Sequence, residues 1–473
     1  MQKYHVCIIG SGPSGERCAI ECGTNGFKTL VVDKRERKVG GVSLHVGTIP
    51  SKTLREVILD ITGFGLSFYL QKKKPEPKEL TLENLYKKVG AIINCEQDVL
   101  EARFRSKNID VLYGEARFVD KNTVEIFNSE RNTTYTIKAD KFVVATGTEP
   151  RRPLDVPFDW EFVYDSDFIF SPKNKREKLP ESMIVVGAGV IGMEYALMFS
   201  ALGVNVSIVD RKNTIFPYID NEINRYLLDI MMSMNINLYF NRNYKEIGVK
   251  EGKAYVVTTK EDKIEADCVL FAQGRVPSTK NLNLEKTGVK TDQRGYILTN
   301  EHYQTDNPNI FACGDVIGYP SLASTSYEQG RVAARALMGL PIHSHNPHLF
   351  PFAIYTIPEI ASVGKTEDEL IKENIPYEKG IGYYHDVSKA IIKGRRNGML
   401  KILFNRETWE ILGVHVIGDQ AAEIVHIGQV ALEMGAKIDY FLNTVFNYPT
   451  WAEIYRIAAF NGINKLTCDL PEN

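Results

Sequence analysis

The sequence lacks an excess of charge of either sign. Lys and Arg number 57 and Asp and Glu number 59, which leaves a net charge of −2. Proteins that bind nucleic acid or an anionic membrane surface usually carry a basic excess, and this chain has none. We therefore expect neither nucleic acid nor a membrane as a partner.

Cysteines are sparse, and the sequence does not open like a secreted protein. The seven cysteines form no CxxC pair in 473 residues, unlike the short, cysteine-dense scaffolds of secreted proteins. Cys18 and Cys22 lie one helical turn apart, but no His or carboxylate cluster completes a metal site, so we predict no metal. The strand-like run from Tyr4 to Ile9 follows the N-terminus without the charged and apolar regions of a signal peptide, so we expect a cytoplasmic protein.

A long apolar stretch at residues 183–209 has the length of a membrane span. Three glycines, Glu194 and the pair Gly203 and Asn205 interrupt it. A strand, a tight turn, a helix and a second strand account for this pattern better than a single membrane helix.

An internal repeat is the first positive signal. The apolar run from Val6 to Ile9 leads into GSGPSG, a helix-like stretch follows, and a second apolar run ends in Asp33. The run from Met183 to Val186 leads into GAGVIG in the same way, and the next apolar run ends in Asp210. The terminal acid lies 23 positions after the first glycine in both copies. The glycines of the two copies are Gly10, Gly12 and Gly15, and Gly187, Gly189 and Gly192.

Each copy has the context that a dinucleotide site requires: a buried strand, a glycine-rich turn, a helix and a carboxylate at the end of the next strand. The first glycine permits the tight turn, the second lets a pyrophosphate approach the backbone, and the third lets the helix pack on the strand. The helix N-terminus offers free N–H groups to the phosphates, and the acid can accept from ribose hydroxyls. The chain is therefore expected to bind two dinucleotides.

Both halves also end alike, in apolar runs followed by turns at Gly147 and Gly274. The segment NIFACGD, which ends at Asp315, has no counterpart in the second half. We expect it to form a strand that returns to the first domain, so that the second nucleotide domain is an insertion in the first. After residue 348 the fingerprints cease, and strand-like and helix-like runs alternate as in an α+β domain.

The predicted fold class is α/β, with two Rossmann-like domains and a C-terminal α+β domain. The expected boundaries are 1–152 for the first nucleotide domain, 153–278 for the second, 279–348 for the return segment and 349–473 for the last domain.

These features resemble the pyridine nucleotide–disulfide oxidoreductases over nearly the whole chain. The motifs that carry the resemblance are GGVSLHVGTIPSK at 40–52, the ATG turn, the ACGD segment and the C-terminal domain. The resemblance implies FAD in the first site, NAD or NADP in the second, and a homodimer or higher oligomer built through the last domain.

The resemblance also implies roles for individual residues. Lys52 and Glu194 are expected to form a catalytic ion pair beside flavin N5, where the cation stabilises electron density on the reduced ring. Asp315 is expected on the ribityl chain. The residues expected to bind FAD are Gly10, Gly12, Gly15, Asp33, Lys34, Gly40, Gly41, Val42, Lys52, Gly147 and Asp315. Those expected to bind the nicotinamide nucleotide are Gly187, Gly189, Gly192, Asp210, Arg211 and Gly274.

Two departures from the disulfide reductases bear on function. Ser43 and Thr48 stand where those enzymes carry their redox cysteines, and a hydroxyl cannot exchange with a disulfide. Tyr448 replaces the catalytic His, although Pro449 and Glu453 remain. We expect this Tyr to be a packing residue; the alternative is that Tyr448 and Glu453 line the approach of the partner subunit to the flavin face. Reduction of disulfides by the thiol route is therefore not expected.

One branch of the family, the soluble pyridine nucleotide transhydrogenases, works without that relay. The branch patterns GTIPSK, GDVIGYPSLAS, YTIPEIxSVGKTE, AAEIxHIGQ and FNYPTxAE all occur here, although many members keep a Cys where this chain has Ser43. The implied reaction is a ping-pong transfer of hydride from NADPH to NAD+ through flavin N5.

Nucleotide preference stays open at this point. Asp210 can accept from the 2′-hydroxyl of NADH and would repel a 2′-phosphate, whereas Arg211 and Lys212 could attract that phosphate. The sequence suits an enzyme that accepts both nucleotides, or a plain NAD site followed by two solvated bases.

Two other functions are compatible with the same cofactor sites. One is a diaphorase or oxidase that passes flavin electrons to quinones or oxygen. The other is a non-catalytic flavoprotein subunit, against which the retention of Lys52, Glu194 and both fingerprints argues.

Overall fold

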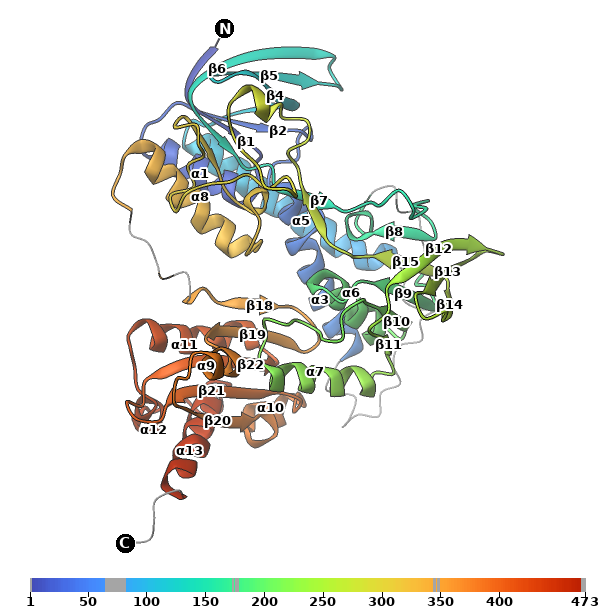
Figure 1. Ribbon diagram of the computed structural model, residues 1–473, viewed down its shortest axis with the longest axis vertical. Helices are drawn as coiled ribbons and strands as arrows, with labels where there is room; N and C mark the ends of the chain where they lie inside the picture. The colour runs from blue at the N-terminus through green and yellow to red at the C-terminus, as the bar shows by residue number, and fades with distance from the viewer. Residues whose placement is uncertain are drawn as a thin grey trace.

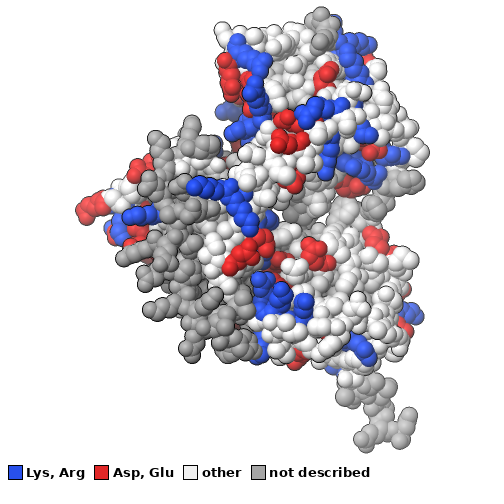
Figure 2. Space-filling model, turned by 180° about the vertical axis from the view of Figure 1, so that it is seen from behind, with Lys and Arg blue, Asp and Glu red and all other residues white. Residues whose placement is uncertain are grey.

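The computed structural model describes residues 2–63, 82–171, 174, 178–342, 346 and 349–468. Three sheets with their covering helices follow one another from one end of the molecule to the other (Figure 1). None of the described helices combines the length and apolar character needed to cross a bilayer. On the face shown in Figure 2, Lys and Arg side chains lie among Asp and Glu side chains.

The first sheet has seven strands in the order β3-β2-β1-β6-β5-β4, with β17 paired to β6. Strands β3, β2, β1, β6 and β17 run parallel, and the run from Val6 to Ile9 is buried, as parallel strands covered on both faces require. The strands are β1 (Gln2–Ile9), β2 (Thr29–Asp33), β3 (Asp110–Tyr113), β4 (Glu115–Asp120), β5 (Thr123–Asn128), β6 (Thr133–Val144) and β17 (Ile310–Ala312). The helices of this part are α1 (Pro13–Thr24), α2 (Gly41–His45), α3 (Thr48–Thr62), α5 (Leu82–Ser106) and α8 (Ala323–Met338).

The second sheet is a five-stranded parallel sheet in the order β11-β10-β9-β15-β8. Its strands are β8 (Val163–Asp165), β9 (Ser182–Val186), β10 (Asn205–Val209), β11 (Asn237–Tyr239) and β15 (Cys268–Phe271). Its helices are α6 (Val190–Ala201) and α7 (Asn221–Ser233), and a small antiparallel sheet adds β12 (Tyr244–Lys250), β13 (Lys253–Thr258) and β14 (Lys263–Ala266). Because β17 returns to the first sheet after this domain, the predicted insertion is confirmed.

The chain crosses between the two nucleotide domains twice, and the two crossings pair with each other. They are β7 (Thr148–Pro150) and β16 (Arg275–Pro277), which form a two-stranded antiparallel ribbon. Backbone hydrogen bonds extend it, since Arg151 N donates to Gly274 O at 3.1 Å and Ser278 N donates to Gly147 O at 3.0 Å. The ribbon therefore ties together the turns that close the two halves.

The C-terminal domain is an antiparallel five-stranded sheet with helices, which confirms the predicted α+β class. The sheet order is β18-β19-β22-β21-β20, with strands β18 (Phe352–Ile354), β19 (Glu359–Gly364), β20 (Tyr377–Tyr383), β21 (Met399–Asn405) and β22 (Ile411–Gly418). The helices are α9 (Glu367–Lys372), α10 (Ser388–Lys393), α11 (Ala421–Glu433), α12 (Asp439–Asn443) and α13 (Glu453–Cys468).

A buried ion cluster joins this domain to the second nucleotide domain. Lys401 on β21 is fully buried, and its Nζ lies 2.9 Å from Asp220 and 2.6 Å from Glu222 at the start of α7. It also pairs with Glu367 on α9. Burial acts to raise the pKa of Glu367, but the hydrogen bond and charge of Lys401, together with the Tyr377 hydroxyl, hold that pKa below its ordinary value. The three carboxylates thus surround a cation that the chain itself supplies.

Candidate active site

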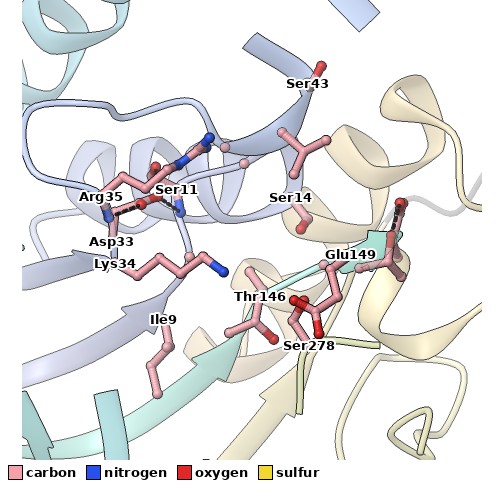
Figure 3. A pocket seen from close by; sticks show the side chains of 18 of the residues that line it. Ile9, Ser11, Ser14, Asp33, Lys34, Arg35, Ser43, Thr146, Glu149 and Ser278 are labelled. Atoms are coloured by element: carbon pink, nitrogen blue, oxygen red, sulfur yellow. Dashed lines mark hydrogen bonds between the residues drawn. The ribbon is translucent and has the colours of Figure 1, made fainter. Parts of the chain in front are cut away.

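A cavity of about 530 Å³ opens at the carboxyl ends of the parallel strands of the first sheet. Strands β1, β2 and β6 each end at it, and helix α1 begins there, as expected for the ligand site of an open α/β sheet. Figure 3 shows side chains from β2, from the turn before α1 and from the end of β6 facing this space. The predicted residues that line it are Gly10, Gly12, Asp33, Lys34, Gly41, Val42, Gly147 and Asp315, whereas Gly15 and Gly40 lie just behind the wall.

The three fingerprint glycines at the start of α1 meet different structural requirements. Gly10 has φ +108°, and a Cβ on it would lie 2.2 Å from Ala145 O. A Cβ on Gly15 would lie 1.9 Å from Gly10 O, so both positions must be glycine for the helix and strands to pack. Around Gly12 the nearest atom to such a Cβ is Gly41 Cα at 4.0 Å, which leaves the backbone open to the cavity. The open cradle and the free N–H groups of α1 suit a pyrophosphate.

Asp33 holds the glycine turn in place. Its carboxylate accepts hydrogen bonds from the Ser11 hydroxyl, from Ser11 N at 3.3 Å and from Arg35 N at 3.0 Å (Figure 3). The Ser11 hydroxyl in turn accepts from Gly40 N at 2.9 Å, which joins the turn to the segment before α2. Ser11 was not predicted, although its place between the first two glycines could have marked it.

Two polar groups of the cavity lining could meet the polar atoms of a ligand. Thr146 Oγ1 is buried without a hydrogen-bond partner among the described residues. Asp315 is half-buried, its carboxylate accepts from the hydroxyls of Thr148, at 3.3 Å, and Ser326, and burial raises the pKa of its carboxyl group. The buried hydroxyl without a partner favours a ligand that brings its own polar atoms.

A second cavity of about 390 Å³ lies at the same edge of the second sheet. Gly187 has φ +113°, a Cβ on Gly192 would lie 2.0 Å from Gly187 O, and a Cβ on Gly189 would meet nothing within 4 Å. As at the first fingerprint, the first and third glycines are required by packing, and the second leaves the backbone open to the cavity. Gly187, Gly189, Asp210, Arg211 and Gly274 line this cavity as predicted, whereas Gly192 lies in the helix behind it.

The charges of the second cavity are mixed. The Asp210 carboxylate accepts from Ala188 N at 2.6 Å and from Lys212 N at 2.7 Å. Arg211 and Lys212 are exposed beside it, and Arg151 lines the same cavity from the crossing ribbon. Three cations thus stand around one carboxylate, and sequence reasoning missed Arg151 because it belongs to the other half of the chain.

Lys52 and Glu194 form an ion pair, as predicted, but neither residue is among those that line the two cavities. Lys52 Nζ lies 2.6 Å from Glu194 Oε2, and the two side chains are 26% and 6% exposed. Lys52 lies one helical turn after Thr48, a lining residue of the first cavity, on α3. Glu194 lies on α6, whose N-cap residue Gly189 lines the second cavity. The pair therefore joins the helices that leave the two predicted nucleotide sites.

Tyr355 is a neighbour of this pair that the sequence did not reveal. Its backbone N donates to Glu194 Oε1 at 2.9 Å, and Lys52 Nζ lies 4.8 Å from the centroid of its ring. It follows β18, so the C-terminal domain reaches the ion pair. No local pattern could have indicated this contact, because 161 positions separate Tyr355 from Glu194.

Ser43 and Thr48 line the first cavity, and no cysteine lines either cavity in the described part of the chain. Cys18, Cys22 and Cys313 are fully buried in the core beside α1.

Tyr448 lies at the surface of the single chain. Its side chain is 72% exposed and its hydroxyl lies 2.7 Å from Ser388 Oγ, so its packing role stays a prediction that its own domain does not provide. Val445 in the same loop is 91% exposed, whereas Phe446 and Trp451 pack against the core of the domain, so the loop between α12 and α13 turns only some of its apolar side chains outward.

Comparison with known proteins agrees with this architecture. The family model described as pyridine nucleotide-disulphide oxidoreductase matches residues 4–330, and the dimerisation domain of that family matches residues 350–459. The chain is 42% identical to a soluble pyridine nucleotide transhydrogenase of Pseudomonas aeruginosa, over 98% of this chain and 99% of that protein. It is 41% identical, with the same coverage, to one of Vibrio parahaemolyticus.

Two solved structures share the fold at low sequence identity. LpdA from Mycobacterium tuberculosis has a TM-score of 0.88 at 23% identity, over 97% of this chain and 99% of that one. The flavoprotein disulfide reductase RclA from Escherichia coli has a TM-score of 0.86 at 22% identity, with the same coverage.

Proposed function

The chain belongs to the pyridine nucleotide-disulphide oxidoreductase family, and from that membership we propose that it is an FAD-dependent transhydrogenase that exchanges hydride between NADPH and NAD+. The observation that carries the proposal is the Lys52–Glu194 pair, which joins helices α3 and α6 where each leaves a cavity of the dinucleotide type. The relatives that share about two fifths of its residues over nearly the full length are named for this reaction.

FAD fits the residues of the first cavity. The open backbone at Gly12 and the N-terminus of α1 suit its pyrophosphate, and Asp33 and Lys34 lie where the adenosine half would be expected. The Thr146 hydroxyl, which has no partner among the described residues, and the half-buried Asp315 carboxylate offer polar contacts for the remaining part of the molecule. When bound, FAD supplies the site with a hydride acceptor and donor, which a protein side chain cannot provide.

Lys52, Glu194 and Tyr355 would position a positive charge beside bound FAD. Beside bound FAD, the Lys52 ammonium would supply a positive charge that stabilises the reduced ring. Glu194 fixes that ammonium, and the Tyr355 N–H fixes Glu194 in turn. This arrangement orients the cation before the reaction begins, so that little reorganisation is needed.

The hydroxyls at Ser43 and Thr48 support exchange between nucleotides rather than reduction of a disulfide. A thiol relay requires two sulfur atoms within reach of the flavin, and both of these lining residues end in oxygen. Electrons that enter from one nicotinamide nucleotide then leave to another through the second cavity, in a ping-pong sequence. Asp210 with Arg211 and Lys212 would allow that cavity to accept NADH and NADPH in turn.

A homodimer in the cytoplasm is part of the proposal. The exposed apolar side chains of the C-terminal domain, which a second copy would cover, include Val430, Met434, Val445 and Tyr448. We also propose domain boundaries at residues 152, 278 and 348, with the segment 279–348 returning to the FAD domain.

An anaerobic exchange assay tests the function. The purified protein, loaded with FAD, is mixed with NADPH and thio-NAD+, and reduction of the thio-nucleotide is followed by its absorbance. We expect exchange without added oxygen, quinone or disulfide. Rapid quinone or oxygen reduction without exchange would make the protein a diaphorase or oxidase, and a flavin that NADPH does not bleach would make it non-catalytic.

A further inference from the structure

We propose that Tyr355 is a positioning residue, whose ring face holds the Lys52 ammonium where that cation stabilises the reduced form of bound FAD. The proposal rests on the function proposed above and adds a residue from the C-terminal domain to the site. Two contacts carry it: the Lys52 Nζ lies 4.8 Å from the centroid of the Tyr355 ring, and the Tyr355 N–H donates to Glu194 at 2.9 Å.

The ring contact supplies something that the carboxylate alone does not. Lysine has four rotatable side-chain bonds, and an ion pair to one carboxylate oxygen leaves the ammonium free to swing about it. A cation within about 6 Å of an aromatic centroid is attracted to the ring face, more strongly where water is excluded. The Lys52 side chain is only 26% exposed, and its ammonium also donates to the Ser51 hydroxyl at 3.4 Å, so the ring adds a contact that confines it further beside Glu194.

Tyr355 is itself held by the helix that carries Lys52. Arg55, one turn after Ser51 on α3, is 3% exposed and donates to Thr356 O at 3.0 Å. The same guanidinium lies 3.1 Å from Glu359 on β19. Helix α3 is thus tied to the segment around Tyr355 by a second buried contact, which holds the Tyr355 ring in position beside Lys52.

The ammonium meets the ring face and not the phenol hydroxyl. Among the described residues the side-chain hydrogen bonds of Lys52 go to Ser51 and Glu194, and its Nζ lies over the Tyr355 ring. Burial, with the neighbouring carboxylates of Glu359 and Glu423, also raises the pKa of Tyr355, which keeps the ring uncharged. The structure therefore assigns the role to the π face, which Phe shares with Tyr and Leu lacks. The backbone N–H to Glu194 is the same in all three, so side-chain variants isolate the ring.

The test is the midpoint potential of FAD in the holoprotein, measured for wild type, Tyr355→Phe and Tyr355→Leu. We expect the Phe variant to match wild type. The Leu variant should shift the equilibrium toward oxidised FAD by roughly threefold to tenfold, which is about 15–30 mV for a two-electron couple. In a Lys52→Met background the Leu substitution should shift nothing further.

Three outcomes would overturn the inference: equal potentials in all variants, equal falls in the Phe and Leu variants, or a Leu effect that persists without Lys52. If Tyr355→Leu does not retain FAD, Tyr355→Met, which fills the volume with a flexible apolar chain, takes its place under the same expectations. The potential is read without any nucleotide substrate. A wild-type protein that fails to exchange hydride would refute the proposed function while leaving this comparison intact.

Discussion

Adding one methyl group at Gly189 should block the second nucleotide site without disturbing the fold. Gly189 is the N-cap of α6 with φ −76° and ψ 177°, a conformation that alanine adopts freely. Nothing lies within 4 Å of the place its Cβ would take, so the chain itself does not resist the change. Alanine is a poorer N-cap than glycine, but it also restricts the unfolded chain, and the two effects leave stability within about 1 kcal/mol.

The substitution should instead weaken nucleotide binding. The methyl group would occupy the space that a pyrophosphate needs to reach the backbone N–H groups, and a hydrogen bond to a charged group is worth about 1.5–3 kcal/mol. At about 1.4 kcal/mol per tenfold, the KM for both NADPH and NADH should rise by roughly 10- to 100-fold. Steady-state kinetics measure this rise, and the flavin absorbance checks that FAD is retained.

Two matched glycine variants separate an effect on nucleotide binding from an effect on folding. Gly192→Ala, whose Cβ would lie 2.0 Å from Gly187 O, should lower the melting temperature instead, because the helix can no longer pack on its turn. Gly12→Ala, in the equivalent open position of the first site, should release FAD while leaving the folded chain intact. A Gly189→Ala variant with unchanged KM values would refute the assignment of this cavity to a nucleotide.

Three further predictions concern charged residues. Lys52→Met should retain FAD and slow hydride exchange by about 10²-fold or more in stopped-flow measurements. Near-normal rates would contradict the proposal that the Lys52 ammonium stabilises the reduced flavin. Arg211→Ala should weaken use of NADPH about tenfold more than use of NADH, and equal losses would exclude a contact with the 2′-phosphate. Lys401→Met should lower the free energy of unfolding by about 3 kcal/mol, since it leaves the buried Asp220 carboxylate without its cation, whereas Lys401→Arg should largely preserve it. Because the folded-state pKa of Glu367 lies below its ordinary 4.5, its contribution to stability is complete above that pH and is lost as the pH falls through the folded value. Denaturant titrations should show a smaller loss in Lys401→Met than in wild type, because Lys379 and Tyr377 still hold Glu367.

Local signals in the sequence were enough to predict the two glycine-rich turns and the acids that accompany them. A tight turn, a helix N-terminus and the acid at the end of the next strand all lie within 23 positions, so Gly10 and Asp33, or Gly187 and Asp210, can be recognised together. The return of β17 was also predictable, because the segment before Asp315 had no counterpart in the second half.

The contacts that complete the site were beyond such reasoning. Arg275 donates to Thr148 Oγ1 at 2.9 Å across 127 positions, and Tyr355 meets Glu194 across 161. Neither contact leaves a periodic or local trace in the sequence, since only the packing of separate domains creates it. The prediction for Tyr448 stays open: an aromatic beside proline is commonly internal, but its own domain does not cover this side chain, so a packing partner would have to come from a second copy of the chain.

The paired crossings β7 and β16 have a mechanical consequence for the inserted domain. A single linking strand lets a domain spin about the axis of that strand, because rotation around single bonds is nearly free. Two strands fastened by hydrogen bonds resist twisting and yield mainly by flexing across their thin direction. Cutting one of them, for example with a protease, would not release the domain, because the other strand and the ion cluster around Lys401 would still hold it.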